Sequence, residues 1–230
     1  MNKPFRLAAA GAVAALTVTL AACGASADSA DPSPAAAAPM SQAPMSGSPM
    51  SGATGAGVTT EADVFGPACD QLPQGDAPGS LDAMGPQPVA TAASTNPLLS
   101  TLVTAVGKVP GLADTVNQQE AITVFAPYNG AFDEVRTQLG DQAFTELLDN
   151  PTQLGDLLSY HIVPQRDDAQ GLIDAGTTNQ LAGGTVTIGG TAQAPTLTDG
   201  TGNTANVLCG NIPTSNATVF VIDKVLMPAS

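Results

Sequence analysis

The chain has 230 residues and a formal net charge of −14 at pH 7, with 20 acidic side chains against six basic ones. A surface with this charge repels phosphate backbones and anionic lipid head groups, so nucleic acid is excluded as a partner class. Tryptophan is absent and aromatic residues make up 3% of the chain. Any core must therefore be built mainly from Leu, Val, Ile and Ala.

The first 22 residues predict a signal for export. Lys3 and Arg6 provide a positively charged start, and residues 7–22 form an uncharged apolar run rich in Ala, Val and Leu. A charged start, an apolar centre and a small-residue end are typical of a secretory signal. The apolar run is shorter than the ~20 residues that a helix needs to cross a bilayer. We therefore expect a cleaved signal peptide over residues 1–22.

A lipid attachment site is predicted at Cys23. Residues 20–23 read Leu-Ala-Ala-Cys and resemble the bacterial lipobox, in which a peptidase cuts before a cysteine that already carries diacylglycerol. Each buried methylene contributes ~0.8 kcal/mol, so two or three acyl chains hold a protein stably on a membrane. We expect a lipoprotein anchored through Cys23 on the extracytoplasmic face of the cell membrane, at the cell surface. The alternative is an ordinary signal cleaved after Ala-x-Ala, with Cys23 as a spare thiol.

Residues 23–57 predict a disordered tether. Ala, Ser, Pro, Gly and Met dominate this segment, and such a composition buries too little apolar surface to offset the entropy of the chain. Met is a soft ligand that suits Cu(I), but we expect the methionines to be incidental to a short Pro-Met-Ser repeat. Ser and Thr among prolines also suggest O-glycosylation, with Thr54, Thr59 and Thr60 as candidate sites.

Helical patterns come first in the rest of the chain. Asn96 is a good N-cap and Pro97 is tolerated at the first helical position, so a helix is predicted to begin there. A β-type run over residues 121–126 follows, and we expect Asn129 to cap the next helix. The helix after Asn129 is expected to carry the apolar residues Phe132, Val135 and Leu139. A further helix is marked by Phe144, Leu147 and Leu148, and another is predicted over residues 151–158, after Asn150.

The hydrophobic period changes at residue 160. Residues 160–163 predict a strand, and residues 169–175 predict a short helix. The later predicted strands, divided by Gly-Gly, Asp-Gly and Ser-Asn turns, are residues 177–181, 185–188, 196–198, 206–212 and 218–226. Helices first and strands later favour an α+β domain in which helices pack against an antiparallel sheet.

Three segments resemble the signatures of fasciclin (FAS1) domains, in the order in which that family has them. Residues 123–132 read Thr-Val-Phe-Ala-Pro-Tyr-Asn-Gly-Ala-Phe, residues 157–163 read Leu-Leu-Ser-Tyr-His-Ile-Val, and residues 219–228 read Val-Phe-Val-Ile-Asp-Lys-Val-Leu-Met-Pro. The resemblance implies a single fasciclin-like domain over residues 88–230. Its expected fold is a β-sandwich or wedge with several helices packed against it.

Two further segments, each containing a cysteine, resemble the mycobacterial-type secreted and lipid-anchored fasciclin antigens. They are Phe-Gly-Pro-Ala-Cys, which ends at Cys69, and Val-Leu-Cys-Gly around Cys209. With Cys23 lipidated, Cys69 and Cys209 remain as an even pair in an oxidising compartment. The resemblance implies a disulfide between Cys69 and Cys209. Such a bond would attach an N-terminal extension over residues 58–87 to a late strand. A redox-active pair is not favoured, because the chain has no Cys-x-x-Cys motif.

His161 is the only histidine of the chain. A catalytic triad around it lacks a Gly-x-Ser-x-Gly elbow, and a zinc site lacks the three or four ligands that it needs. Two roles remain for the Tyr160–His161 pair. A neutral imidazole among apolar residues can lock a strand to a helix through backbone hydrogen bonds, or the pair can act in recognition. We therefore predict no enzyme, no cofactor and no metal.

The carboxylates also have structural explanations. Asp133 and Glu134 are expected in the first turn of a helix, where the helix dipole favours anions. Residues 199–203 faintly resemble an oxygen-rich calcium loop, but they lack its twelve-residue register and bidentate Glu. We expect a hairpin turn there instead.

Two functions remain open after this search. The first is a surface protein whose fasciclin-like domain mediates adhesion or contact with a protein or matrix partner. The second is an extracytoplasmic carrier that binds a small apolar ligand, such as a lipid or haem, in a groove between helices and sheet. A large apolar pocket in the structure would favour the carrier.

Overall fold

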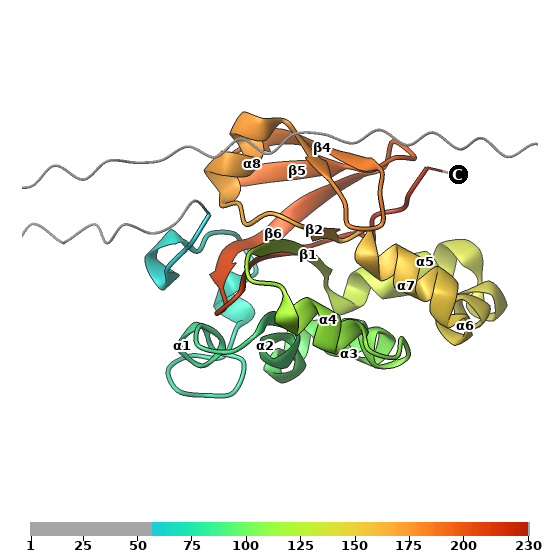
Figure 1. Cartoon of the computed structure of the whole chain (residues 1–230), viewed down its shortest axis with the longest axis horizontal. Coiled ribbons are helices and arrows are strands. Elements are labelled where there is room, and N and C mark those ends of the chain that lie inside the picture. Colours follow the sequence, from blue (N-terminus) through green and yellow to red (C-terminus); the bar gives the residue numbers. More distant parts are fainter. Residues whose placement is uncertain (1–56, 230) are drawn as a thin grey trace, which may run out of the picture. The chain divides into compact units, whose positions relative to one another are not determined.

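The computed structural model describes residues 57–229. The predicted signal peptide, Cys23 and residues 23–56 of the predicted tether lie outside these residues. The helices are α1 (Leu81–Met84), α2 (Val89–Thr95), α3 (Ser100–Gly107), α4 (Leu112–Gln118), α5 (Asn129–Leu139), α6 (Asp141–Asp149), α7 (Pro151–Ser159) and α8 (Ala169–Ala175). The strands are β1 (Ile122–Pro127), β2 (Ile162–Val163), β3 (Thr177–Asn179), β4 (Thr185–Thr191), β5 (Ala194–Thr198), β6 (Thr204–Pro213) and β7 (Ala217–Ile222). The predicted α+β class is confirmed (Figure 1).

The strands form one mixed sheet in the order β2-β1-β7-β6-β5-β4-β3. The prediction of an antiparallel sheet is wrong at one pair, because β1 and β7 run parallel, from Ile122 opposite Ala217 to Pro127 opposite Ile222. Nearly every residue of both strands is buried, and a continuous apolar run of this kind is typical of a strand that is covered on both faces. That signal favours a parallel pair inside the sheet, and neither β1 nor β7 lies at a sheet edge.

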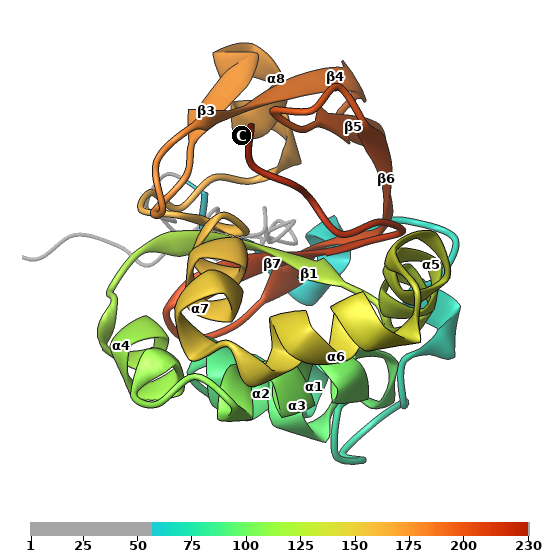
Figure 2. The ribbon, with the colours of Figure 1, turned by 90° about the vertical axis from the view of Figure 1, so that its right-hand side faces the viewer.

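Strands β1 and β7 separate two hydrophobic cores. Their side chains alternate between the two faces of the sheet, so Ile122 and Val221 belong to a core shared with the helices, whereas Phe125 and Phe220 belong to the other. The rings of Phe125 and Phe220 lie 6.1 Å apart between centroids. Figure 2 shows β1 and β7 crossing the centre, with α1 to α4 and α6 on one side and β3 to β5 with α8 on the other.

Asn side chains accept hydrogen bonds from backbone N–H groups at the start of several helices. Asn96 Oδ1 accepts a hydrogen bond from the Leu98 N–H at 3.0 Å, and Asn150 caps α7 as predicted. The predicted cap by Asn129 is wrong, because α5 has Tyr128 at its N-cap without a side-chain bond. Asn129 Oδ1 instead accepts from the Thr101 N–H at 2.9 Å, at the start of α3. Asn129 therefore joins two helices, a role that depends on tertiary packing.

Some predicted element ends differ from the structure. Helix α7 ends at Ser159 and β2 contains only Ile162 and Val163, so Tyr160 and His161 lie in the connection and not in a strand. Strand β7 ends at Ile222, four residues before the predicted end. Asp133 and Glu134 lie beyond the first turn of α5, because that helix begins at Asn129. Leu139, expected on the apolar face of α5, is 47% exposed.

The hairpin turn predicted at residues 199–203 is confirmed. It connects β5 to β6, whose residues Thr198 and Thr204 pair across the ladder. Asp199 Oδ1 accepts hydrogen bonds from the backbone N–H groups of Thr201 and Asn203, both at 2.9 Å. One carboxylate oxygen of Asp199 therefore accepts hydrogen bonds from two backbone N–H groups of the turn.

Within residues 57–229, no single helix has the length and hydropathy needed to span a bilayer. The only combination that meets the criterion is α2 followed by residues Pro97–Gly107, and these two pieces are bent by 100° from each other.

Candidate functional site

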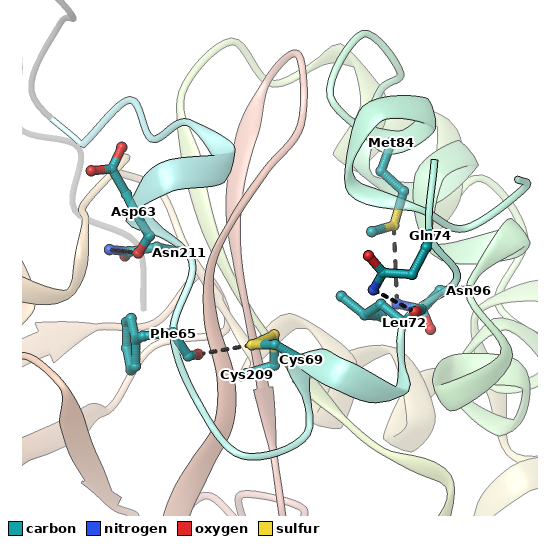
Figure 3. The surroundings of a disulfide bond; sticks show 9 residues. All are labelled: Asp63, Phe65, Cys69, Leu72, Gln74, Met84, Asn96, Cys209 and Asn211. Atoms are coloured by element: carbon teal, nitrogen blue, oxygen red, sulfur yellow. Dashed lines mark hydrogen bonds between the residues drawn. A yellow bond between two sulfur atoms is a disulfide. The ribbon is translucent and has the colours of Figure 1, made fainter. Parts of the chain in front are cut away.

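A disulfide joins the N-terminal extension to the sheet (Figure 3). Cys69 lies in a short 3-10 turn and is bonded to Cys209 on β6, as predicted, with their Cα atoms 5.0 Å apart. Beside it, Phe65 and Gly210 exchange backbone hydrogen bonds of 3.3 and 2.8 Å. The extension therefore pairs with β6 through backbone bonds as well as through the disulfide.

Asn211 marks an irregularity of β6 next to the disulfide. The ladder between β6 and β7 shifts register between Cys209 and Ile212, and Asn211 has a positive φ of 58°, which Asn tolerates better than most residues. Its Oδ1 accepts from the Ala169 N–H at 2.9 Å and its Nδ2 donates to the Asp63 carbonyl at 3.1 Å. The sequence analysis missed this role, although Gly-Asn inside an apolar strand is a signal for a bulge.

Asn216 joins helices α2 and α4 to the turn between β6 and β7. Its Oδ1 accepts from the Val89 N–H at 2.9 Å, and its Nδ2 donates to the carbonyls of Val116 and Gln119 at 2.9 and 2.8 Å. The side chain is buried. Local patterns indicate only a turn at this position, because the bonded groups are about 100 residues away in the chain.

His161 is buried between α7 and the C-terminal segment, with 3% of its surface exposed. Its Nδ1 lies 2.8 Å from the Leu157 carbonyl, which can only accept, so Nδ1 carries the proton. Its Nε2 accepts from the Leu226 N–H at 2.9 Å. Burial lowers the pKa of His161 to about 4, against the opposing effects of the Leu157 hydrogen bond and the Asp199 charge. The ring is therefore neutral at pH 7, with both nitrogens occupied.

Tyr160 is also buried, with 1% of its surface exposed. Its hydroxyl donates to the Thr185 carbonyl at 2.9 Å and accepts from the Gly200 N–H at 3.1 Å. Burial raises the pKa of the hydroxyl. Tyr160 and His161 thus lie inside the domain, where a macromolecular partner does not reach their side chains.

Asp199 completes this buried polar cluster. Its Oδ2 accepts from the Met227 N–H at 2.9 Å, one residue after the Leu226 N–H that His161 binds. Burial acts to raise the pKa of Asp199, but the hydrogen bonds from Met227, Thr201 and Asn203 outweigh it and lower the pKa. The cluster attaches the C-terminal segment to α7 and to the β5–β6 turn.

An apolar groove of about 360 Å³ lies between helices α2, α3 and α4 and strand β1. Among residues 57–229, no charged side chain lines it. The lining residues are Val89, Ala90, Thr91, Ala93, Ser94, Leu102, Val103, Val106, Gly107, Leu112, Ala113, Val116, Asn117, Val124, Phe125, Leu158, His161 and Ile162.

Small residues of three helices line the groove. Ala93 on α2, Ala113 on α4 and Gly107 at the end of α3 leave space that longer side chains would fill. Val124 at the centre of β1 is consequently only half-buried, although its strand is paired on both sides. Close packing normally fills such spaces in protein interiors, so the groove is a distinct feature of the domain.

Polar groups of the groove come from its helices. Asn117 on α4 accepts from the Ala90 N–H through Oδ1 at 3.0 Å. Its Nδ2 has no hydrogen-bond partner among the residues that the structure describes. Ser94 Oγ donates to the Thr91 carbonyl at 2.6 Å. His161 also lines the groove, but its ring nitrogens are bonded elsewhere. Between residues 57 and 229, no three His, Cys, Asp or Glu side chains converge as metal ligands would.

The fold and these sites define a class of protein: an α+β domain with a mixed sheet between two cores and a disulfide-bonded N-terminal extension. Residues 97–228 match the fasciclin domain family, and the chain belongs to that family.

Two mycobacterial relatives extend the match beyond this domain. The chain is 40% identical over 180 residues to the cell surface glycolipoprotein MPT83 of Mycobacterium tuberculosis. The matched segment covers 73% of each chain. It is 38% identical over 172 residues to the immunogenic protein MPB70 of Mycobacterium bovis. This second match covers 72% of this chain and 83% of the relative. A solved FAS1 domain pair from the insect cell adhesion molecule fasciclin I superposes with a TM-score of 0.53. That match covers 61% of this chain and 51% of the insect chain, and at 14% identity it shows the fold alone.

Proposed function

We propose that this protein is a lipid-anchored surface protein, held by acyl chains on Cys23, whose fasciclin domain mediates contact with a protein or matrix partner. The observation that carries the proposal is the Leu-Ala-Ala-Cys segment of residues 20–23, in a chain 40% identical to a protein named a cell surface glycolipoprotein. The role is non-enzymatic. It would display a folded domain outside the cell on a long segment rich in Ala, Ser and Pro.

The adhesive surface must be formed by exposed residues of the domain. Tyr160 and His161 do not belong to it, because their side chains are covered. A partner with complementary positive charge fits best, since the chain has a net charge of −14 and opposite charges accelerate and orient association.

Replacing Cys23 by Ala is expected to leave the protein without lipid, because no thiol remains at position 23. The protein should then be found uncleaved or in the medium. The measurement is detergent fractionation of cells together with the mass of the N-terminal peptide. Gly24→Ala serves as the control, since it keeps the thiol and a small residue after it. A Cys23→Ala protein that is still extracted with detergent at mature length would contradict the anchor.

The contact function is tested with the full-length Cys23→Ala chain immobilised on beads and exposed to cell-wall and host matrix extracts. A macromolecule should be retained saturably and competed off by the free chain at low ionic strength. Retention should weaken with added salt, because screening reduces attraction between opposite charges. Binding that is neither saturable nor competed by the free chain would contradict an adhesive role.

A second candidate function is transport or storage of a small apolar ligand outside the cytoplasm. The apolar groove favours it specifically, because a concave site with apolar walls and a few polar groups is the usual form of a small-molecule site. In this protein the groove opens beside β1, which is paired with β2 on one side and β7 on the other. The two functions are compatible, since the groove and the exposed surfaces are different parts of the domain.

A further inference from the structure

We propose that the groove between α2, α3, α4 and β1 binds one acyl chain of an uncharged acyl ester, and that Asn117 donates a hydrogen bond to the ester carbonyl. The proposal rests on the carrier function and names its ligand class. It is carried by the size of the groove, the chemistry of its walls, its lack of charge and the free amide of Asn117.

The size of the groove limits its occupant. A volume of about 360 Å³ is near the lower end of the ~300–1,000 Å³ found for small-molecule sites. One linear chain fits such a volume better than a large fused-ring cofactor does.

The walls of the groove favour an aliphatic ligand over a planar one. Side chains such as Val106, Leu112 and Val124 dominate it, and Phe125 is the only Phe, Tyr or Trp among its lining residues. Haem would also need an axial ligand. His161 is the only histidine of the chain, and its nitrogens are bonded to the Leu157 carbonyl and the Leu226 N–H. Haem binding through Nε2 would require the Leu226 N–H bond to break, because that bond occupies the lone pair that iron needs.

The charges around the groove favour an ester over a free fatty acid. No cationic side chain in the described part of the chain lines the groove, so a carboxylate placed there would lose hydration without gaining an ion pair with these residues. Lys108 follows directly after the lining residue Gly107, but its ammonium group is 2.6 Å from Asp149. The net charge of −14 adds a general repulsion of anions.

Asn117 supplies the polar contact that an ester needs. Its Oδ1 is fixed by the Ala90 N–H, so the orientation of the amide is set and Nδ2 remains as a donor. A carbonyl oxygen accepts one such bond without carrying a charge. The ester would therefore be held at its carbonyl by Asn117 and along its chain by Val124 and its neighbours.

The test uses the full-length Cys23→Ala chain, which has no acyl group of its own, and methyl-detected NMR of its Val and Leu side chains. The probes are methyl decanoate, decanoate at pH 7 and haemin. Methyl decanoate is expected to shift the methyl signals of Val106, Leu112 and Val124 saturably. Decanoate should bind at least tenfold more weakly, and haemin should leave these signals unchanged.

Two variants separate the parts of the proposal. Asn117→Asp keeps an oxygen for the Ala90 N–H but removes the Nδ2 donor, and it should weaken methyl decanoate binding about tenfold, as expected for one hydrogen bond. Ala93→Leu fills the groove from α2 and should abolish binding. Thermal melting of each variant establishes that it is folded before binding is compared. Gln118→Ala serves as a control with unchanged affinity, because Gln118 is exposed at the end of α4 and does not line the groove.

The outcomes distinguish the ligand class from the carrier function. Equal binding of decanoate and its methyl ester, or no effect of Asn117→Asp, would overturn the acyl ester proposal and leave a carrier for other apolar ligands. Haemin binding at the groove would likewise refute the ligand class alone. If none of the probes shifts the groove methyl signals in the folded chain, both the carrier function and the ligand class are refuted.

Discussion

Acidification from pH 7 to pH 4 is expected to lower the free energy of unfolding by about 3 kcal/mol through His161 alone. The pKa of His161 is about 4 in the folded chain, against an ordinary value of 6.5. Between these two pH values the unfolded chain binds a proton that the folded chain does not, so stability falls as the pH decreases. The contribution of His161 is fully present above pH 6.5 and is lost progressively toward pH 4.

The measurement is urea unfolding at several pH values for the wild-type chain and a His161→Gln variant, which does not titrate. Protonation of Asp199, whose pKa is lowered in the folded chain, destabilises both chains, so the difference between the two curves isolates His161. Parallel curves between pH 6.5 and pH 4 would show that the ring is not buried in its neutral form.

Truncation of the same side chain by His161→Ala should lower the melting temperature by several degrees. The Leu157 carbonyl and the Leu226 N–H both lose their partner, at ~1–3 kcal/mol for an orphaned buried group, and a small cavity adds to the cost. Partner binding well below the melting temperature should hardly change. An unchanged melting temperature with weakened binding would indicate a recognition role for Tyr160 and His161.

Removal of the disulfide is expected to destabilise the domain by up to about 4–5 kcal/mol, because the bridge closes a loop of about 140 residues and restricts the unfolded chain. The double variant Cys69→Ala with Cys209→Ala should unfold at lower urea concentration. Amides of the extension, such as those of Phe65 and Ala68, should exchange with solvent before those of β1, because few other bonds hold them to β6.

Two controls accompany the disulfide variant. Non-reducing mass spectrometry of the wild-type chain must find the Cys69 and Cys209 peptides linked, and the variant must retain its circular dichroism at low denaturant concentration. Free thiols at both positions in protein taken from the cell surface, or equal urea midpoints of the two chains, would contradict the stabilising role of the bridge.

Features that depend on neighbouring residues could be predicted from the sequence. Asn96 and Asn150 cap the helices that follow them, and the Asp199 turn closes a hairpin between adjacent strands, because each uses bonds within a few residues. The fasciclin signatures and the cysteine segments predicted the class of domain and the disulfide. Cys23 lies outside the residues that the structure describes, so the lipid anchor at this position remains a prediction.

Features that depend on distant residues could not be predicted in this way. Asn129 caps α3 across 28 residues of chain, and Asn216 reaches carbonyls about 100 residues away, so neither role leaves a local pattern. The groove is a further case. The sequence places Val124 in an apolar strand, but it does not show whether a helix covers the side chain. Whether Ala93 and Gly107 face it depends on how the helices pack.

The parallel pairing of β1 with β7 has a consequence for how the chain reaches its fold. Ile122 pairs with Ala217, so the two hydrophobic cores form around β1 only when β7 is available. Contacts of such large sequence separation slow folding, and until they form β1 has two apolar faces and an open edge that can pair with other chains. An exported chain would therefore complete its domain only after β7 has crossed the membrane. The final strand thus sets the time at which the protein stops needing protection from aggregation.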